Sequence, residues 1–275
     1  MGVSNAFVSK RVAALEAALK VKLLHRTTRQ VSLTEHGEAV LQSAQRILDE
    51  VDRMSEEVSN TRVEVSGKLR LCTSSGFGRN RLAAAISAFA RQYPRIELQL
   101  ELLDRPVDLV GEGFQLDIRV GTVSDPNLIA RRLATCHSVL CAAPAYLARF
   151  GTPGSLDELK AHRCIPIRER DQDFGRWELA GPEGLTAIKV SGPLSANNGE
   201  IVRQWAIDGH GIILRSTWDV GRDIAAGLLA PVLPQYFQPA DVWAVYPSRL
   251  SVSAKVKVCV EFLEAWFAQG GMSAA

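Results

Sequence analysis

A short basic segment near the N-terminus carries two guanidinium groups and two hydroxyls, on Arg26, Thr27, Thr28 and Arg29. Such groups can contact the phosphates of a DNA duplex, and phosphate contacts position a protein on DNA. The segment runs into residues 30–33, which alternate like a β-strand, and then into Thr34, which is placed to cap a helix. We predict an arm that contacts DNA; the alternative is a solvated basic turn.

Residues 4–19 have the pattern of an amphipathic helix upstream of this arm. Its apolar face is formed at spacings of four, three and four by Val8, Val12, Leu15 and Leu19. The polar residues that could meet base edges and phosphates in a major groove are Ser4, which can also cap the helix, Asn5, Ser9, Lys10 and Arg11. Residues 1–33 hold six Lys or Arg and one acidic residue, whereas residues 34–66 hold three and eight. This local positive charge, in a chain with a net charge of only +2, favours a DNA-binding region.

The segment resembles the DNA-binding region of LysR-type transcriptional regulators, in which a recognition helix, a β wing and a linker helix follow one another. The matching residues are Leu15, Glu16, Leu19, Leu23, Leu24, Arg26, Arg29, Val31, Leu33, Thr34 and Gly37. The resemblance implies a winged helix-turn-helix that binds double-stranded operator DNA. Lys20 departs from it, because the family usually has a left-handed Gly there, and another residue costs roughly 1 kcal/mol or more.

The start of the chain is a second departure from the family pattern. Met1 stands where the family has the turn before its recognition helix, so the helix-turn-helix is only partial. We expect a misassigned start or a truncated gene, an apolar helix face with little to cover it, and weak DNA binding. A small-molecule-binding or heterodimerising decoy that has lost DNA binding is the alternative function.

Residues 34–66 predict a linker helix that pairs two chains. Apolar residues recur with a 3.5-residue period at Val40, Ala44, Ile47, Val51, Met54 and Val58. A stripe this narrow suits a two-helix seam. We therefore expect a homodimer or homotetramer; the alternative is a helix packed on its own domain.

Residues 67–275 alternate strand-like and helical patterns, which predicts an α/β domain. The strand–helix–strand order of its first part, up to residue 120, implies a parallel sheet with right-handed crossovers. Strands are expected at residues 68–72, 96–103, 116–120, 138–142, 164–167 and 242–246, with a hairpin over 177–190. The order resembles the two-lobed, periplasmic-binding-protein-like effector domain of LysR-type regulators, and segments 104–121, 130–153 and 196–200 resemble the CrgA-like branch. This implies lobe I at about 67–136 and 243–275 and lobe II at about 137–242, so the fold class is a multi-domain α+β protein: DNA-binding domain 1–33, linker helix 34–66 and effector domain 67–275.

Polar residues at the carboxyl ends of strands predict an effector site between the lobes. Thr73, Ser74 and Ser75 precede one expected helix and Asn197 and Asn198 precede another, and free helix amides favour a carboxylate. The family resemblance adds Arg105, Gly121, Thr122 and Arg168 to this site. A small anionic or aromatic acid is the expected effector; the alternative is that the Ser, Thr and Asn residues are only caps.

The remaining residue types argue against other functions. The five cysteines are odd in number and form no CxxC pair, so we expect reduced, buried thiols, with a thiol switch as the alternative. The five histidines are scattered, which gives a metal site no support. No GxSxG, P-loop or complete GxGxxG motif is present, so neither an enzyme nor a bound cofactor is expected. No apolar run reaches the length of a membrane span, and we expect a cytoplasmic protein.

Overall fold

A computed structural model describes residues 5–26, 31–58, 65–123, 125–168, 174–248 and 253–271. The chain divides into two compact units, residues 1–63 with 111–113, and residues 64–110 with 114–275. No helix in the described ranges is both long enough and apolar enough to cross a membrane.

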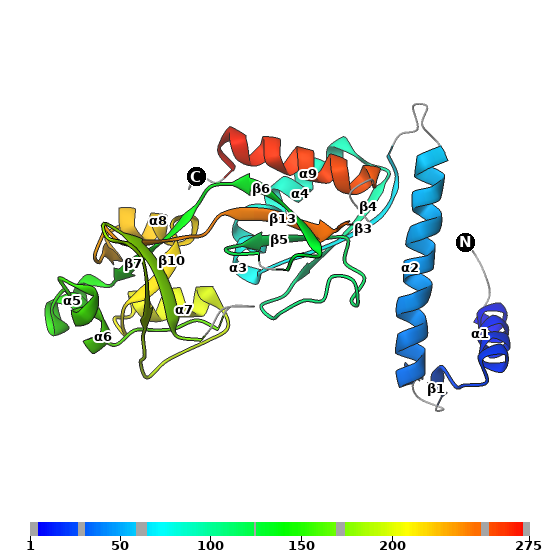
Figure 1. The fold of residues 1–275 in the computed structure, drawn as a ribbon, viewed down its shortest axis with the longest axis horizontal. Helices are drawn as coiled ribbons and strands as arrows, with labels where there is room; N and C mark the ends of the chain where they lie inside the picture. The colour runs from blue at the N-terminus through cyan, green and yellow to red at the C-terminus, as the bar shows by residue number, and fades with distance from the viewer. Residues whose placement is uncertain are drawn as a thin grey trace. The chain divides into compact units, whose positions relative to one another are not determined.

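Within the described residues, the first unit contains two helices and a small antiparallel hairpin (Figure 1). Its elements are α1 (Asn5–Leu19), β1 (Leu24–Arg26), β2 (Val31–Leu33) and α2 (Glu35–Val58). β1 pairs with β2 so that Leu24 lies opposite Leu33. The predicted order of helix, wing strand and long helix is therefore confirmed.

Thr34 and Gly37 attach the start of α2 to the loop that connects α1 and β1. The Thr34 hydroxyl accepts a hydrogen bond from the Gly37 amide at 2.9 Å, which confirms the predicted cap, and donates to the Lys22 carbonyl at 2.6 Å. A Cβ at Gly37 would overlap the carbonyl oxygen of Leu23. Glycine at this position therefore lets the helix start approach the loop.

Lys20 and Glu16 shape the exit from α1. Lys20 has a φ of 58°, which confirms the left-handed conformation expected at this position. Here a lysine adopts it in place of the usual glycine. The buried Glu16 carboxylate accepts hydrogen bonds from the amides of Leu23 at 2.8 Å and Leu24 at 3.2 Å. The Leu23 hydrogen bond is the largest of the interactions that lower the pKa of Glu16. One carboxylate thus anchors the start of β1 to the helix.

Lobe I of the second unit is a five-stranded sheet in the order β4-β3-β5-β13-β6. Its strands are β3 (Gly67–Thr73), β4 (Ile96–Leu102), β5 (Leu116–Val120), β6 (Leu128–Ala134) and β13 (Val242–Pro247). β3 runs parallel to β4 and β5, as predicted, but β13 is antiparallel to both of its neighbours. The predicted parallel pairing is confirmed for β3, β4 and β5, and β13, for which no direction was predicted, runs the opposite way because it enters lobe I from the second lobe.

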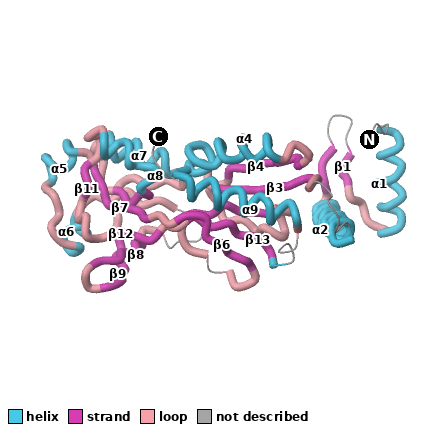
Figure 2. The backbone as a smooth tube through the Cα atoms, turned by 90° about the horizontal axis from the view of Figure 1, so that it is seen from above, coloured by secondary structure: helices cyan, strands magenta, loops and turns pink. Residues whose placement is uncertain are grey.

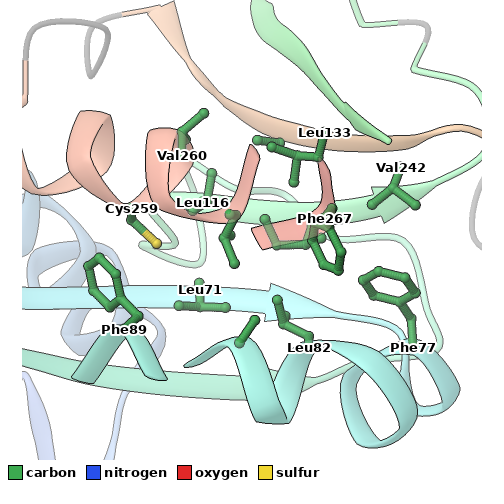
Figure 3. Close-up of a cluster of buried hydrophobic side chains, with 14 of the residues drawn as sticks. Leu71, Phe77, Leu82, Phe89, Leu116, Leu133, Val242, Cys259, Val260 and Phe267 are labelled. Atoms are coloured by element: carbon green, nitrogen blue, oxygen red, sulfur yellow. The ribbon is translucent and has the colours of Figure 1, made fainter. Parts of the chain in front are cut away.

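Helices cover one face of the lobe I sheet, and their apolar side chains form its main core. They are α3 (Ser75–Phe77), the π-helical turn η1 (Gly78–Leu82), α4 (Ala83–Gln92), α9 (Ala254–Trp266) and the C-terminal turn η3 (Phe267–Gly271). Figure 3 shows Leu71 and Leu116 of the sheet meeting Phe89 of α4 and Val260 of α9. The last helix thus packs in lobe I, to which the family resemblance assigned residues 243–275.

Lobe II is an antiparallel sheet in the order β10-β7-β12-β8-β9, with β11 also paired to β7. Its strands are β7 (His137–Ala142), β8 (Arg176–Gly181), β9 (Gly184–Lys189), β10 (Ile213–Ser216), β11 (Ala230–Pro231) and β12 (Phe237–Pro239), and its helices are α5 (Pro144–Phe150), α6 (Leu156–Ala161), α7 (Gly199–Ile207) and α8 (Thr217–Ala225). The predicted hairpin is β8–β9. The strand predicted over 164–167 was wrong: Cys164 and Ile167 make only isolated bridges, because Pro166 between them has no N–H to donate to a ladder.

Two chain segments connect the lobes, as predicted, and Figure 2 shows the strands of this unit in two groups joined by them. One segment leads from β6 to β7 and the other from β12 to β13. The Cys136 amide donates to the Asp241 carboxylate at 3.0 Å, and the Ala240 amide donates to the Cys136 carbonyl at 2.9 Å. The two connections are therefore hydrogen-bonded to each other where they pass between the lobes.

Candidate functional site

A cavity of about 670 Å³ lies between lobes I and II. Lobe I lines it from the carboxyl ends of β3 and β5 and from Phe77, and lobe II lines it from β8, β10 and the start of α7. This is where open α/β sheets bind ligands, and the volume is typical of a small-molecule site.

Four of the nine predicted effector residues line the cavity, and five have other roles. The lining residues are Ser74, Gly121, Thr122 and Asn197. Thr73 is buried and donates to the Ile118 carbonyl at 2.7 Å, joining β3 to β5. Arg105 is exposed and donates to the Pro106 carbonyl at 3.0 Å, while Arg168 lies over the Phe174 ring at 5.4 Å.

The two predicted helix starts are both engaged by the protein itself. The Asn198 side chain caps α7, since its Oδ1 accepts from the amides of Glu200 at 3.1 Å and Ile201 at 3.2 Å. The Ser75 amide donates to Asp104 Oδ1 at 2.8 Å. Ser74 makes no side-chain cap bond. The alternative that these residues are only caps is therefore correct for Asn198 and wrong for Ser74. At Ser75, the carboxylate of Asp104 occupies the position expected for a ligand carboxylate.

Two buried arginines, which the sequence analysis did not identify, line the cavity from opposite lobes. Arg119 on β5 contacts the buried Asp117 carboxylate through Nε at 3.1 Å and Nη2 at 3.0 Å. Arg215 on β10 contacts Asp219 in the same way at 2.8 and 2.7 Å. The sequence could have indicated the Arg119 pair. Asp117 and Arg119 lie two residues apart in the apolar strand 116–120, so they share one face of it, and charged residues are rarely buried unless they are paired.

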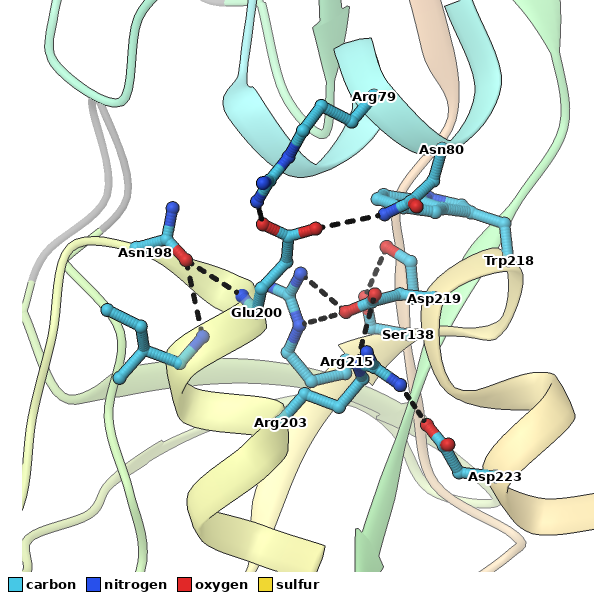
Figure 4. A network of polar contacts seen from close by, with 12 residues as sticks. Arg79, Asn80, Ser138, Asn198, Glu200, Arg203, Arg215, Trp218, Asp219 and Asp223 are labelled. Atoms are coloured by element: carbon cyan, nitrogen blue, oxygen red, sulfur yellow. Dashed lines mark hydrogen bonds and ion pairs between the residues drawn. The ribbon is translucent and has the colours of Figure 1, made fainter. Parts of the chain in front are cut away.

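The Arg215 pair belongs to a larger charge network with Arg203 and Asp223 (Figure 4). Arg203 contacts Asp223 at 2.7 Å and lies 3.8 Å from Asp219. A Cβ at Gly199 would overlap the Arg215 guanidinium, so glycine at the first position of α7 allows this close approach. The network therefore holds Arg215 in one position at the cavity wall.

The predicted DNA-contacting residues lie partly within the described ranges. Lys10 and Arg11 are exposed on α1, Ser9 is half-buried, Asn5 begins α1 and Arg26 ends β1. Ser4, Thr27, Thr28 and Arg29 lie outside the described residues.

The apolar faces of both helices in the first unit are largely exposed. On α1, Val8, Leu15 and Leu19 are 47, 43 and 45% exposed, so the expected lack of cover is confirmed for these residues. On α2, Ile47 and Val51 are 64 and 47% exposed. The alternative that α2 packs on its own domain is not supported at these two positions.

The five cysteines are all buried. Burial raises the pKa of Cys141, Cys164 and Cys259 to about 12, so these three are protonated thiols at neutral pH. The thiol-switch alternative is not supported at these three, because the reactive form of cysteine is the thiolate. No His, Cys, Asp and Glu side chains cluster as a metal site within the described ranges.

Comparison with known proteins agrees with this architecture. Residues 62–268 match the family described as the LysR substrate binding domain, and residues 1–38 match the bacterial regulatory helix-turn-helix protein, lysR family. The chain belongs to the LysR family. This LysR-type protein is a DNA-binding transcriptional regulator with a DNA-binding region of the helix-turn-helix type and a two-lobed effector domain.

Relatives and solved structures cover nearly the whole of the LysR-type chain. It is 55% identical over 269 residues to the HTH-type transcriptional regulator DmlR of Escherichia coli K12, covering 98% of this chain and 88% of the relative. It is 44% identical to the transcriptional activator TtdR of the same strain, covering 98% and 87%. The structure of CrgA from Neisseria meningitidis shares 32% identity with a TM-score of 0.63, covering 99% and 91% of the two chains. Full-length AphB of Vibrio cholerae shares 26% identity with a TM-score of 0.64, covering 96% and 90%.

Proposed function

We propose that this LysR-type regulator binds a small organic acid in the cavity between lobes I and II, and that binding changes its grip on operator DNA. The observation that carries this proposal is the pair of buried arginines, Arg119 and Arg215, which line the cavity from opposite lobes. A guanidinium group has five N–H donors in a fixed plane and binds carboxylates with charge-assisted hydrogen bonds. Its aspartate partner holds each guanidinium in place before a ligand arrives.

Apolar side chains within an otherwise largely polar lining support a ligand that carries a ring or an apolar skeleton beside its polar groups. Phe77, Trp177 and Leu185 supply apolar surface, whereas Ser74 and Thr122 supply hydroxyls. Ligand sites typically combine mostly apolar walls with a few polar groups that fix orientation. An anionic or aromatic acid is therefore the ligand class that we propose.

Ligand binding would couple to DNA through the spacing of the lobes. One arginine comes from each lobe, so a ligand that contacts both favours one lobe arrangement over others. A ligand shifts an equilibrium only by its difference in affinity for the two states. We propose that residues 67–275 bind the effector and that residues 1–33 bind DNA. The linker helix, residues 34–66, would transmit the change in lobe arrangement from the first of these segments to the second.

We further propose that α2 pairs two copies of the chain into a homodimer, the minimal unit of the oligomer. The exposed apolar side chains of Ile47 and Val51 support this pairing. Paired DNA-binding units would read two half-sites of an operator.

Since a regulator acts on chromosomal DNA, we propose that it works in the cytoplasm.

The test is a thermal-shift screen of small carboxylic acids with three proteins: the wild type, Ser74→Trp and Ser191→Trp. Ser74 lines the cavity, whereas Ser191 is exposed and away from it. A ligand at one hundred times its Kd stabilises the folded state by about 2.7 kcal/mol. We expect an acid that stabilises the wild type and Ser191→Trp but not Ser74→Trp. Equal stabilisation of Ser74→Trp would refute binding in this cavity.

A further inference from the structure

Asp104 links the two lobes through a single carboxylate. It lies just after β4 in lobe I and lines the cavity. Its Oδ1 accepts a hydrogen bond from the Ser75 amide at 2.8 Å, and its Oδ2 accepts one from Asn198 Nδ2 of lobe II at 2.9 Å. The two oxygens of one side chain therefore connect the beginning of a helical run in lobe I with the cap of α7 in lobe II.

Both of these helix starts favour negative charge. The helical run of lobe I begins at Ser75 and continues through η1 and α4 to Gln92. In lobe II, the Glu200 and Ile201 amides donate to Asn198 Oδ1, and Asn198 Nδ2 in turn donates to Asp104. Backbone amides that have no partner within their own helix, together with the helix dipole, make each start positive. A carboxylate between the two starts offsets their mutual repulsion and satisfies donors from both.

Glu200 makes a second connection between the same elements. Its carboxylate accepts a hydrogen bond from Asn80 Nδ2 at 3.3 Å and pairs with Arg79, both from η1 of lobe I (Figure 4). The start of α7 is thus held to lobe I on two sides. Asp104 differs from Glu200 because it lines the cavity, whereas Glu200 does not.

We propose that Asp104 is a built-in carboxylate clasp: it fills the anion position between two helix starts, sets the spacing of the lobes and keeps a ligand carboxylate out of that end of the cavity. Asp104 is a positioning residue in this scheme. The clasp and its effect on lobe spacing exist without any ligand, so they can be tested independently of the proposed effector, whereas the exclusion of a ligand carboxylate rests on the proposed function.

The substitution Asn198→Asp removes the hydrogen bond to Asp104 but keeps the cap of α7, so it tests the clasp separately from the cap. The new side chain keeps an oxygen to accept from the Glu200 and Ile201 amides, but it turns a carboxylate oxygen toward Asp104 in place of an N–H donor. Like charges at this distance repel. Combining Asn198→Asp with Asp104→Asn exchanges donor and acceptor and restores the hydrogen bond.

Asn127→Asp is a matched control. Asn127 Nδ2 also donates to an aspartate, Asp125 Oδ1, at 3.2 Å, but both residues are exposed and lie in lobe I. The substitution therefore introduces the same pair of carboxylates without affecting the connection between the lobes.

The first test measures lobe spacing by pulsed electron paramagnetic resonance in the full chain without effector. Spin labels are attached to Arg91→Cys on α4 and Lys160→Cys on α6, both exposed positions. We expect Asn198→Asp to lengthen and broaden the distance distribution, the double variant to restore it, and Asn127→Asp to leave it unchanged. An unchanged distribution in Asn198→Asp would overturn the clasp.

The second test is chemical rescue of Asp104→Ala by formate. Losing a carboxylate with two charge-assisted hydrogen bonds should lower Tm by roughly 4–8 °C. Sodium formate should recover at least half of this loss relative to sodium chloride at equal ionic strength, because formate can occupy the vacated position. Asp108→Ala, in the same segment but outside the cavity lining, should show no formate-specific gain. Equal effects of formate and chloride on Asp104→Ala would contradict an anion position at this site.

Discussion

Replacing Arg215 by Met should destabilise the effector domain strongly. Arg215 and Asp219 have side chains that are 8% and 2% exposed, and two guanidinium nitrogens lie 2.7 and 2.8 Å from the same carboxylate oxygen. Removing one partner of a buried ion pair costs about 3–5 kcal/mol, because the other charge is left buried and unpaired. Arg203, 3.8 Å from Asp219, compensates in part, so we expect a loss of about 3 kcal/mol in the free energy of unfolding.

Urea denaturation of the wild type, Arg215→Met and the double variant Arg215→Met with Asp219→Leu measures this loss. Because replacing both partners by apolar groups removes the unpaired charge, the double variant should recover at least half of the lost stability. A loss below about 1 kcal/mol in Arg215→Met, which is the typical value of an exposed ion pair, would refute the reasoning. A double variant no more stable than Arg215→Met would also refute it.

Three further predictions concern local features. Lys20→Gly should raise the stability of the DNA-binding unit by roughly 1 kcal/mol in thermal unfolding, because glycine adopts a φ of 58° without strain; a lower Tm would contradict this. The pKa of Glu16 is lowered in the folded state, so its stabilising effect is complete above the ordinary value of 4.5 and is lost as pH falls through the folded-state pKa. Wild type should therefore lose more stability than Glu16→Gln between pH 6 and acid pH, and parallel pH profiles would contradict this. Ile47→Glu should weaken self-association in sedimentation experiments at least tenfold, whereas Glu38→Gln on the same helix should not; equal association would argue against pairing through α2.

Local sequence patterns predicted the elements whose causes are local. The periods of α1 and α2 and the Thr34 cap depend on residues within a few positions of one another, and the structure contains all of them. The left-handed conformation at Lys20, in contrast, was implied only by the family resemblance. The β3–α–β4 rhythm likewise predicted parallel pairing. In each case the interactions that decide the structure lie within one or two elements.

The features that were not predicted depend either on distant residues or on local signals that an apolar strand pattern hides. The direction of β13 depends on the path through lobe II, and the interruption at 164–167 depends on Pro166, whose missing N–H outweighs the apolar pattern. The Asp104 carboxylate meets an amide 29 residues away and a side chain 94 residues away, so no spacing in the sequence indicates either contact. Arg215 lies in the four-residue strand β10 and pairs with a residue of the next helix, which a strand pattern does not show.

The central claim is that a ligand in the interlobe cavity changes the affinity of this regulator for DNA. Fluorescence anisotropy with the intergenic DNA beside its own gene measures that affinity at fixed salt, with and without an acid that stabilises the wild type. Coupling between two sites is typically 5–150-fold. We predict a change of at least fivefold for the wild type and Ser191→Trp and none for Ser74→Trp; an unchanged affinity in the wild type, or the same change in Ser74→Trp, would contradict the account.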